Sequence, residues 1–401
     1  MLRTKYFLIV IVVLVTVLSY FTLTRDDASI NSNEVVQDKL DDNNARDIDS
    51  LVSSNRDHIQ HKRKKHKPRK VKRILYWNDY YGSRNFGFCC GRGPYIKNQC
   101  SNTDCSTSKD RSEDLESFDA IVFHGRSLNY KDIPARRYPH QHYIFLTIES
   151  AAYPGTANLS VWDNFFNLTM TYKQDSDVPL SYGRVKRKEN VYQSSMTTRK
   201  HKAKKHLAAW LVSNCNTQSK REILIEELKR YLPEDSVHVY GKCGTRRCPG
   251  DSPTDRDQCW RMLENDYKFY LALENSVCPD YVTEKMYEAL KHDIVPVVLG
   301  GADYDAMFPP HSFINMMNYS NMSSLAEHLL QLDQDDAQYM KYLEWKSVFS
   351  ILNSKEEFNQ GHCLLCDKLH NLDNSKEKKV VNLRRWFLED NPCKSHPSLV
   401  G

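Results

Sequence analysis

The sequence predicts an α/β fold with two mostly parallel sheets, preceded by a membrane anchor and a polar stem. Short apolar runs alternate with helical patterns on both sides of a basic stretch at residues 184–206. Such alternation is typical of βαβ units and of a parallel sheet. The chain has 401 residues, 40% of them hydrophobic and 27% charged, which is enough for one or two packed cores. The composition therefore excludes a chain that is disordered throughout.

The net charge of +5 comes from two local segments. Residues 61–73 contain nine Lys and Arg and no acid, so the rest of the chain carries −4. Residues 184–206 contain nine more cations and one glutamate, which leaves about −12 elsewhere. Cations confined to two segments do not make a basic face over a fold, so we expect no nucleic-acid partner. For residues 61–73, a solvated spacer is favoured over contact with anionic lipid or glycan.

An uncharged run at residues 6–23 is eighteen residues long, just enough to span a bilayer. Arg3 and Lys5 precede it, and the positive-inside rule keeps these cations in the cytosol. Bulky residues continue through Phe21, which favours an uncleaved anchor over a signal peptide. We expect a single-pass type II membrane protein. Its predicted parts before the folded body are a cytosolic tail (1–5), a transmembrane segment (6–23) and a stem (24–72).

Sequons and cysteines agree with a lumenal body. Glycosylation sequons begin at Asn158, Asn167, Asn318 and Asn321. All twelve cysteines follow residue 88, as expected in an oxidising compartment. Structural bridges are favoured over a redox motif for Cys363 and Cys366, because this pair lies near the end of the chain, and a zinc site lacks correctly spaced histidines. The disulfide candidates are Cys89, Cys90, Cys100, Cys105, Cys243, Cys248, Cys259, Cys278, Cys363 and Cys366.

The apolar runs give the expected elements in chain order. In the first half, strands are predicted at residues 73–78, 119–124 and 142–149. In the second half, the predicted elements are strands at 206–214, 236–241 and 294–301 and helices at 219–232 and 281–292. Ligands of parallel sheets bind beyond the carboxyl ends of the strands. We therefore expect the site residues to follow the strands directly.

A first candidate site lies at the start of the 219–232 helix. Ser219-Lys-Arg-Glu222 fits a capping box, in which the serine and the glutamate three residues later satisfy backbone donors. Arg221 then lies in the first turn, where free amides, the helix dipole and a guanidinium can hold a diphosphate. The alternative is a solvated arginine.

A second candidate site is the irregular polar stretch at residues 274–285, between an apolar segment at 269–273 and a new helix. Backbone amides are free to bind ligands at such a boundary. Glu284 could bind ribose hydroxyls and Lys285 a phosphate, as a nucleotide sugar requires. The alternative is an ordinary surface pair, and spacing alone does not decide between the two.

Residues 267–285, continuing through 294–301, closely resemble the signature of the α1,3/α1,4-fucosyltransferases that use GDP-fucose, glycosyltransferase family ten. The resemblance covers about residues 73–395. The cysteine-rich insert at 243–259, with Cys278, resembles the invertebrate and plant members more than the vertebrate Lewis-type ones. Further matching segments are Trp210–Cys215 followed by Arg221, Phe145–Ser150, Asn167–Tyr172, Asp175–Asp177 and Cys363–Cys366.

The resemblance implies a fold of two Rossmann-like domains facing across a cleft, the GT-B type. Its domains would be an acceptor-side domain (73–200), a GDP-fucose-binding domain (201–350) and a C-terminal segment (351–401) that returns to the first domain. It also implies roles by motif position. Glu149 would be the general base, Arg221 and Lys285 would hold the diphosphate, and Ser213, Asn214, Asn275, Tyr281 and Glu284 would line the donor site.

The implied activity is that of a Golgi α1,3-fucosyltransferase, which moves fucose from GDP-fucose to a GlcNAc hydroxyl of a glycoprotein glycan with inversion. A transferase of another nucleotide sugar and an inactive glycan-binding relative are the alternatives. No cofactor is expected, and a divalent metal is expected at most to stimulate, so Asp175-Ser-Asp177 is interpreted as structural. Cys363 and Cys366 are expected to bridge to the cluster at 89–105. The acceptor glycan stays open between core GlcNAc, outer N-acetyllactosamine and other protein-linked glycans.

Overall fold

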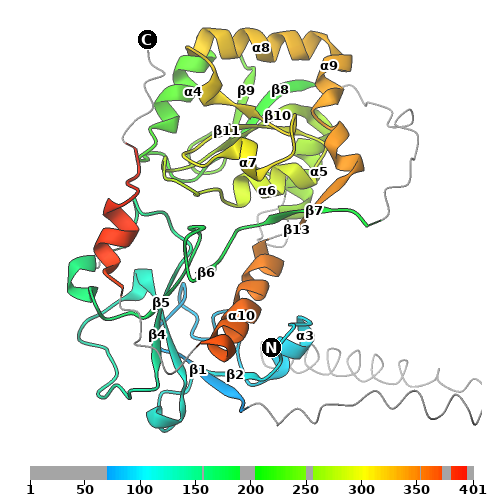
Figure 1. Cartoon of the computed structure of the whole chain (residues 1–401). Helices are drawn as coiled ribbons and strands as arrows, with labels where there is room; N and C mark the ends of the chain where they lie inside the picture. Colours follow the sequence, from blue (N-terminus) through cyan, green and yellow to red (C-terminus); the bar gives the residue numbers. More distant parts are fainter. Residues whose placement is uncertain are drawn as a thin grey trace, which may run out of the picture. The chain divides into compact units, whose positions relative to one another are not determined.

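Two parallel sheets organise the folded part of the chain, as the alternation of apolar runs predicts (Figure 1). The expected anchor and nearly all of the stem lie outside the described residues. Among the residues that are described, no helix is both long and apolar enough to cross a membrane. The computed structural model describes residues 70–155, 158–189, 204–249, 256–352, 354–372 and 381–394.

The first sheet has six strands in the order β2-β1-β3-β4-β5-β6, and all its pairs are parallel. β2 lies on one side of β1, and β3 pairs with β1 on the other side, through Ile74 and Ala120. The topological switch point of this sheet is therefore between β1 and β3. The strands are β1 (Lys72–Tyr76), β2 (Cys105–Ser108), β3 (Ala120–His124), β4 (His142–Thr147), β5 (Leu168–Thr171) and β6 (Val178–Pro179).

The helices expected between the strands of this first sheet are largely missing, so that expectation was wrong. Within the described residues of this half, the connections hold one five-residue helix, α3 (Gly93–Lys97), and three 3₁₀ turns. The loops carry Gly and Pro at short intervals, as at Pro134 and Pro139, and these residues interrupt helices. The 3₁₀ turns are η1 (Leu115–Ser117), η2 (Gly125–Ser127) and η3 (Leu159–Trp162).

The second sheet is parallel throughout, in the order β12-β11-β10-β8-β9. Every residue of β10 is buried, because helices cover both faces of the sheet. The order places β9 on one side of β8 and β10 on the other, so the topological switch point lies between β8 and β10. The strands are β8 (His206–Leu211), β9 (Val237–Tyr240), β10 (Tyr267–Leu273), β11 (Val295–Leu299) and β12 (Ile314–Asn315).

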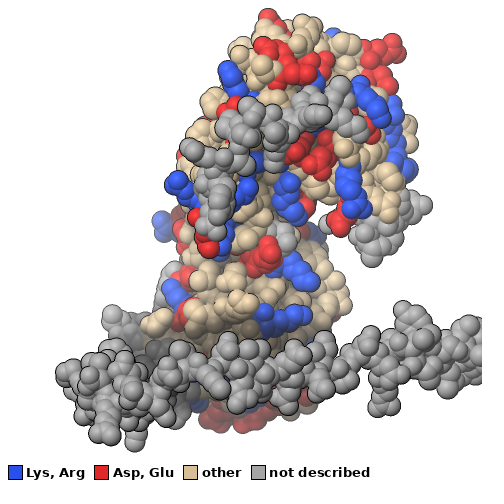
Figure 2. Space-filling view, turned by 90° about the vertical axis from the view of Figure 1, so that its right-hand side faces the viewer, with Lys and Arg blue, Asp and Glu red and all other residues tan. Residues whose placement is uncertain are grey.

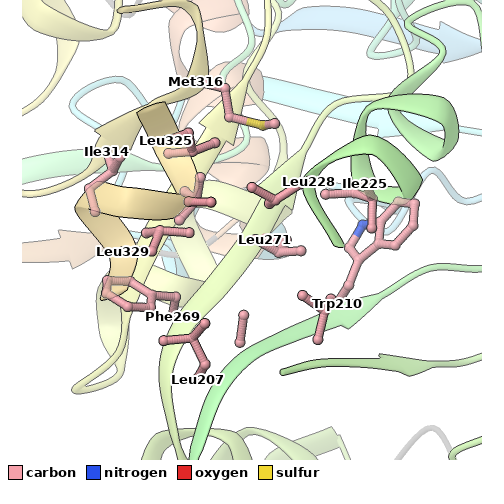
Figure 3. Packing of buried hydrophobic residues seen from close by; sticks show 14 of the residues in the cluster. Leu207, Trp210, Ile225, Leu228, Phe269, Leu271, Ile314, Met316, Leu325 and Leu329 are labelled. Atoms are coloured by element: carbon pink, nitrogen blue, oxygen red, sulfur yellow. The ribbon is translucent and has the colours of Figure 1, made fainter. Parts of the chain in front are cut away.

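Helices pack on each face of the second sheet (Figure 1). On one face, Ile225 and Leu228 of α4 and Leu325 and Leu329 of α8 meet Phe269 of β10 and its neighbours (Figure 3). The other face is covered by three helices that lie between α4 and α8 in the sequence. The helices of the first face are α4 (Arg221–Lys229), α8 (Met322–Gln334) and α9 (Asp336–Lys341), and those of the second are α5 (Arg256–Asp266), α6 (Glu284–Lys291) and α7 (Tyr304–Met307).

Segments from the end of the chain pack on the first sheet. Helix α10 (Ser354–Asn371) places Leu365 and Leu369 in the core with β1 and β3. On the opposite face of this sheet, Phe387 contacts Phe145 at 5.5 Å between ring centroids. The remaining elements are a two-stranded antiparallel sheet of β7 (Arg184–Arg187) and β13 (Phe349–Leu352), the turns η6 (Met316–Asn318) and η7 (Glu344–Ser347), and the π-helical turn η8 (Arg385–Glu389).

Six disulfides use all twelve cysteines. The expected link from Cys363 and Cys366 to the first cysteine cluster is confirmed. Two cysteines outside the candidate set, Cys215 and Cys393, are also bridged. The pairs are Cys89–Cys90, Cys100–Cys363, Cys105–Cys366, Cys215–Cys243, Cys248–Cys259 and Cys278–Cys393.

Charged residues of both signs are mixed on the face of the molecule that Figure 2 shows. Basic side chains there alternate with acidic ones, and much of the described surface between them is uncharged. This mixture differs from the continuous cationic surface that binding to a polyanion requires.

Candidate functional site

A cavity of about 810 Å³ lies at the carboxyl ends of β8, β9 and β10, at the switch point of the second sheet. Its position follows the rule for open parallel sheets. Tyr281, which the sequence also assigned to the donor site, does not line the cavity: it is 2% exposed and packs on Tyr172 at 4.9 Å. The predicted residues that do line it are Ser213, Asn214, Arg221, Asn275, Glu284 and Lys285.

Arg221 is the first residue of α4, and its side chain reaches back under the strand ends. The residue is 3% exposed, and its guanidinium donates to the carbonyl oxygens of Leu273 and, at 3.2 Å, Asn214. Burial lowers the pKa of Arg221, and the carboxylate of Glu274 opposes this effect. Its buried Nε has no partner within the described residues. A fixed cation with a spare donor is suited to an anionic ligand.

The capping box predicted at Ser219-Lys-Arg-Glu222 does not form. Lys220 occupies the N-cap with a φ of +51°, and the Ser219 hydroxyl donates to the carbonyl of Glu274 at 2.7 Å. The Glu222 carboxylate accepts from the backbone and hydroxyl of Thr217 at 3.1 and 2.8 Å. The Ser219 hydroxyl therefore binds the carbonyl of Glu274, directly after β10, and does not cap α4. The chain enters the helix through Lys220, whose backbone is left-handed. This entry still leaves Arg221 in the first turn.

Lys285 and Glu274 form the polar centre of the site. Glu274 follows β10 and is fully buried, and its carboxylate accepts from Thr283 at 2.8 Å and from Lys285 at 3.1 Å. Lys285 also contacts Glu284 at 3.2 Å. Burial alone would lower the pKa of Lys285, but the two carboxylates raise it above its usual value. The lysine is therefore held as a cation at the cavity wall.

Sequence reasoning placed Glu274 in the candidate stretch at residues 274–285 but gave it no role in the site. It also missed Tyr270, Gly241 and Arg247, which line the cavity. Gly241 has a φ of +94°, and a Cβ there would lie 2.5 Å from the carbonyl oxygen of Val212. No short motif marks Gly241 or Arg247, which come to the cavity from the loop after β9.

Glu149 lies at the carboxyl end of the first sheet, two residues beyond β4, and it does not line the cavity. Its side chain is 21% exposed. The Tyr81 hydroxyl donates to its Oε1 at 2.6 Å, and Nη1 of Arg126 lies 3.5 Å from the same oxygen. A partly exposed, oriented carboxylate can accept a proton from a bound hydroxyl group.

Direct contacts connect the surroundings of Glu149 to the segment after β10. Ser150 and Ser276, each next to a predicted site residue, share a buried hydrogen bond of 2.7 Å. The Tyr182 hydroxyl donates to the carbonyl of Ile148 at 2.6 Å. Burial raises the pKa of Tyr182, and neighbouring groups that include Tyr281, Glu284 and Glu149 raise it further. Glu149 and Glu284 therefore both lie within electrostatic range of one hydroxyl.

Comparison with known proteins decides the family. The model "Fucosyltransferase, N-terminal" matches residues 69–183, and the model "Glycosyltransferase family 10 (fucosyltransferase) C-term" matches residues 201–386. Alpha-(1,3)-fucosyltransferase C of Drosophila melanogaster is 31% identical over 415 residues, covering 96% of this chain and 89% of the relative. The chain belongs to glycosyltransferase family 10.

Other similar proteins agree with this family 10 assignment. An alpha-(1,3)-fucosyltransferase of Caenorhabditis elegans is 34% identical over 305 residues, covering 73% of this chain and 76% of the relative. Among solved structures, an alpha1,3-fucosyltransferase with GDP-fucose aligns with a TM-score of 0.50 at 15% identity. That alignment covers 77% of this chain and 92% of the other, and it supports the α/β glycosyltransferase fold. The protein is therefore a glycosyltransferase enzyme of the fucosyltransferase family.

The two carboxylates of the Asp175-Ser-Asp177 triplet in this family 10 enzyme bind different partners. Asp175 accepts from the indole nitrogen of Trp386 at 3.0 Å. Asp177 accepts from the backbone and hydroxyl of Thr169, both at 3.0 Å. These hydrogen bonds support the structural interpretation, because Asp175 links the first half to the C-terminal segment and Asp177 links two segments of the first half.

The four sequons of the glycosyltransferase differ in exposure. Asn158, Asn318 and Asn321 are exposed, although Asn321 also caps α8 by accepting from the amide of Ser324 at 2.9 Å. Asn167 is 4% exposed, and its side-chain oxygen accepts from the amide of Tyr143 at 3.0 Å. A glycan needs an accessible amide nitrogen, so the folded state disfavours the Asn167 sequon and keeps the other three as predictions.

Proposed function

We propose that the protein is an α1,3-fucosyltransferase that transfers L-fucose from GDP-fucose to a GlcNAc hydroxyl of a glycoprotein glycan, with inversion. The observation that carries this proposal is the cavity in which Arg221 and Lys285 meet at the carboxyl ends of β8 and β10. Two fixed cations suit a diphosphate. The relatives named above are α1,3-fucosyltransferases, so we propose GDP-fucose as the nucleotide sugar.

In the proposed donor site, Arg221 and Lys285 hold the diphosphate. Negative charge grows on the leaving phosphate as the fucose bond breaks, so these cations stabilise the transition state more than the ground state. In this proposal Glu284 binds the ribose hydroxyls. The other proposed donor residues are Ser213, Asn214, Asn275 and Tyr281; Tyr281 would act by packing beside the site, since it is buried.

In the proposed acceptor site, Glu149 removes the proton from the GlcNAc hydroxyl as the hydroxyl oxygen attacks fucose. The attack takes place opposite the departing GDP, so a single displacement inverts the anomeric carbon and one base suffices. The cations in this scheme are protein side chains, so activity is expected to persist in EDTA, with a divalent metal at most stimulatory.

We further propose that the enzyme is anchored in the Golgi membrane by residues 6–23, with its catalytic part in the lumen. The uncharged run, the preceding cations and the six disulfides support this location. Expression in secretory cells should give protein that resists carbonate extraction. A freely secreted form that begins near residue 24 would contradict the anchor.

Donor hydrolysis and glycan transfer test the proposed activity. The purified lumenal part, residues 68–401, should release GDP from GDP-fucose and fucosylate a glycan array, with little release from GDP-mannose. A preference for another nucleotide sugar would support the alternative transferase. Glycan binding without turnover of any donor would identify an inactive relative, and both results would contradict the proposal.

A further inference from the structure

Three loops of the first sheet converge on Glu149. In the strand order β2-β1-β3-β4, the chain turns back between β1 and β3, which makes this the switch point of the sheet. The loop after β1 carries Tyr81, η2 after β3 carries Arg126, and Glu149 follows β4. The carboxyl ends of three adjacent strands therefore supply one carboxylate and two groups that contact it.

Both side-chain contacts use the same carboxylate oxygen. Tyr81 donates to Oε1 of Glu149 at 2.6 Å, and Arg126 approaches that oxygen to 3.5 Å. Among the described residues, the side-chain contacts of this carboxylate are made through Oε1, so Oε2 is the oxygen available to a bound hydroxyl. A hydrogen bond that is accepted by a carboxylate is short and strong, so it can fix the orientation of the carboxylate.

The phenol of Tyr81 is held in place although the residue is half exposed. Its ring lies 4.8 Å from the ring of Tyr80 and 4.9 Å from that of His124. His124 is itself fixed, because its Nδ1 hydrogen-bonds the carbonyl of Asp79 at 2.9 Å. Tyr81 has a φ of +49°, so the backbone turns at this residue to bring the side chain over the strand ends.

We propose that Tyr81 is a positioning residue for the catalytic base. Its hydroxyl holds Oε1 and so fixes the rotation of the Glu149 carboxylate, which leaves Oε2 to accept the proton of the acceptor hydroxyl. This inference rests on the proposed function, in which Glu149 is the base. The contact spans 68 residues of sequence and joins two loops, and no motif in the chain marks it.

Other titratable groups also surround the carboxylate, and they define the control. The charged and titratable groups that face Glu149 are Arg126, Tyr80, Tyr81, His124, Tyr182 and Tyr281. Tyr80 is the matched control because it is the adjacent tyrosine, packs against Tyr81 and lies near the same carboxylate. The hydrogen bond to Oε1 comes from Tyr81 alone of these two residues.

The test compares Tyr81→Phe with Tyr80→Phe and the unchanged enzyme. Each substitution removes one oxygen and keeps the ring packing. For Tyr81→Phe we expect kcat to fall roughly tenfold, as for a lost hydrogen bond to a charged group. The KM for GDP-fucose and the affinity for GDP should stay within about twofold of the unchanged enzyme.

Tyr80→Phe should keep both kcat and the KM for GDP-fucose close to those of the unchanged enzyme. Normal kcat in Tyr81→Phe would overturn the positioning role and leave the proposed function intact. A fall in kcat accompanied by a comparable rise in the KM for GDP-fucose, or equal losses in both variants, would also overturn it, because a structural role predicts these results. Failure of the unchanged enzyme to transfer fucose would overturn the proposed function and this inference with it.

Discussion

The two halves of this glycosyltransferase hold their site residues in different ways. In the second half, helices cover both faces of the sheet, and the charged groups are buried: Arg221 is 3% exposed and Glu274 fully buried. In the first half, loops and short turns follow the strands. There Glu149 is 21% exposed and Arg126 43%. Buried ion pairs fix charge before a ligand arrives, whereas exposed loops leave room for acceptors of different shape.

Disulfides stabilise the first half, in which regular helices are few. Cys100–Cys363 and Cys105–Cys366 fasten α10 to this half. Cys278–Cys393 joins the loop after β10 to the C-terminal segment, and Lys394 donates to the carbonyl of Val277 at 2.8 Å beside it. Covalent links of long span can stabilise a half that has a loop-rich surface. The second half relies more on its helices.

Removing a cation from the second half should weaken donor binding and turnover together. Arg221→Ala and Lys285→Ala each take a fixed charge from the bound diphosphate and from the transition state. We expect GDP affinity to fall together with turnover, the latter roughly 10²–10³-fold. Lys229→Ala removes a lysine that pairs with Glu226 on the surface of α4 and should leave both unchanged. Normal GDP binding in both cavity variants, measured by calorimetry, would contradict a preformed cationic site.

Removing disulfides compares the stability of the two halves. In the chain-entropy model a bridge contributes about 2–5 kcal/mol, and more for a longer loop. Cys100–Cys363 and Cys105–Cys366 close nearly the same span, so the first variant changes all four of these cysteines to serine and opens a span of 263 residues, whereas Cys215→Ser/Cys243→Ser opens a span of 28. Loop-closure entropy predicts at least about 2 kcal/mol more destabilisation for the first variant. Urea unfolding of the lumenal part measures both losses, and equal losses would show that the long bridges have no special role.

A buried histidine should make the first half sensitive to acid. His362 of α10 is fully buried, and its Nδ1 hydrogen-bonds the Tyr76 hydroxyl at 3.1 Å. Burial lowers the pKa of His362 to about 3. As the pH falls, this histidine is protonated in the unfolded chain at a higher pH than in the folded one. The group therefore costs no folding stability above about pH 6.5, and the free energy of unfolding decreases as the pH falls below that value.

Urea unfolding at two pH values measures this loss. Between pH 7 and pH 5 the group should account for about 2 kcal/mol of lost stability. His362→Gln should remove that part of the pH dependence, whereas His140→Gln, at an exposed histidine, should keep it. An identical pH dependence in the unchanged protein and in His362→Gln would show that this histidine does not titrate on unfolding.

The second half was more predictable from sequence than the first, for physical reasons. Strands buried on both faces appear as continuous apolar runs, as in β8, β10 and β11, so the positions of Arg221 and Lys285 beside strand ends could be inferred. The predicted capping box does not form, because the Ser219 hydroxyl donates to the carbonyl of Glu274, 55 residues away in the sequence. Local patterns carry no information about such a partner.

The first half shows the same limit more strongly. Its expected helices are loops, and Tyr81 reaches Glu149 across a separation that no periodicity reports. Cysteine pairing was predicted only as a link between clusters, because many connectivities satisfy the same spacing. The role of Glu149 itself rests on family resemblance, since a glutamate after a strand has no distinctive pattern.

The central claim is that donor binding and proton removal are performed by different halves of the molecule. Glu149→Gln tests it most directly, with the exposed Glu116→Gln as the control. The substitution keeps shape but removes basicity, so fucose transfer should fall roughly 10²–10⁴-fold while GDP affinity by calorimetry stays within about twofold. Loss of GDP binding with normal transfer at saturating GDP-fucose would contradict the account, because Glu149 would then belong to the nucleotide site.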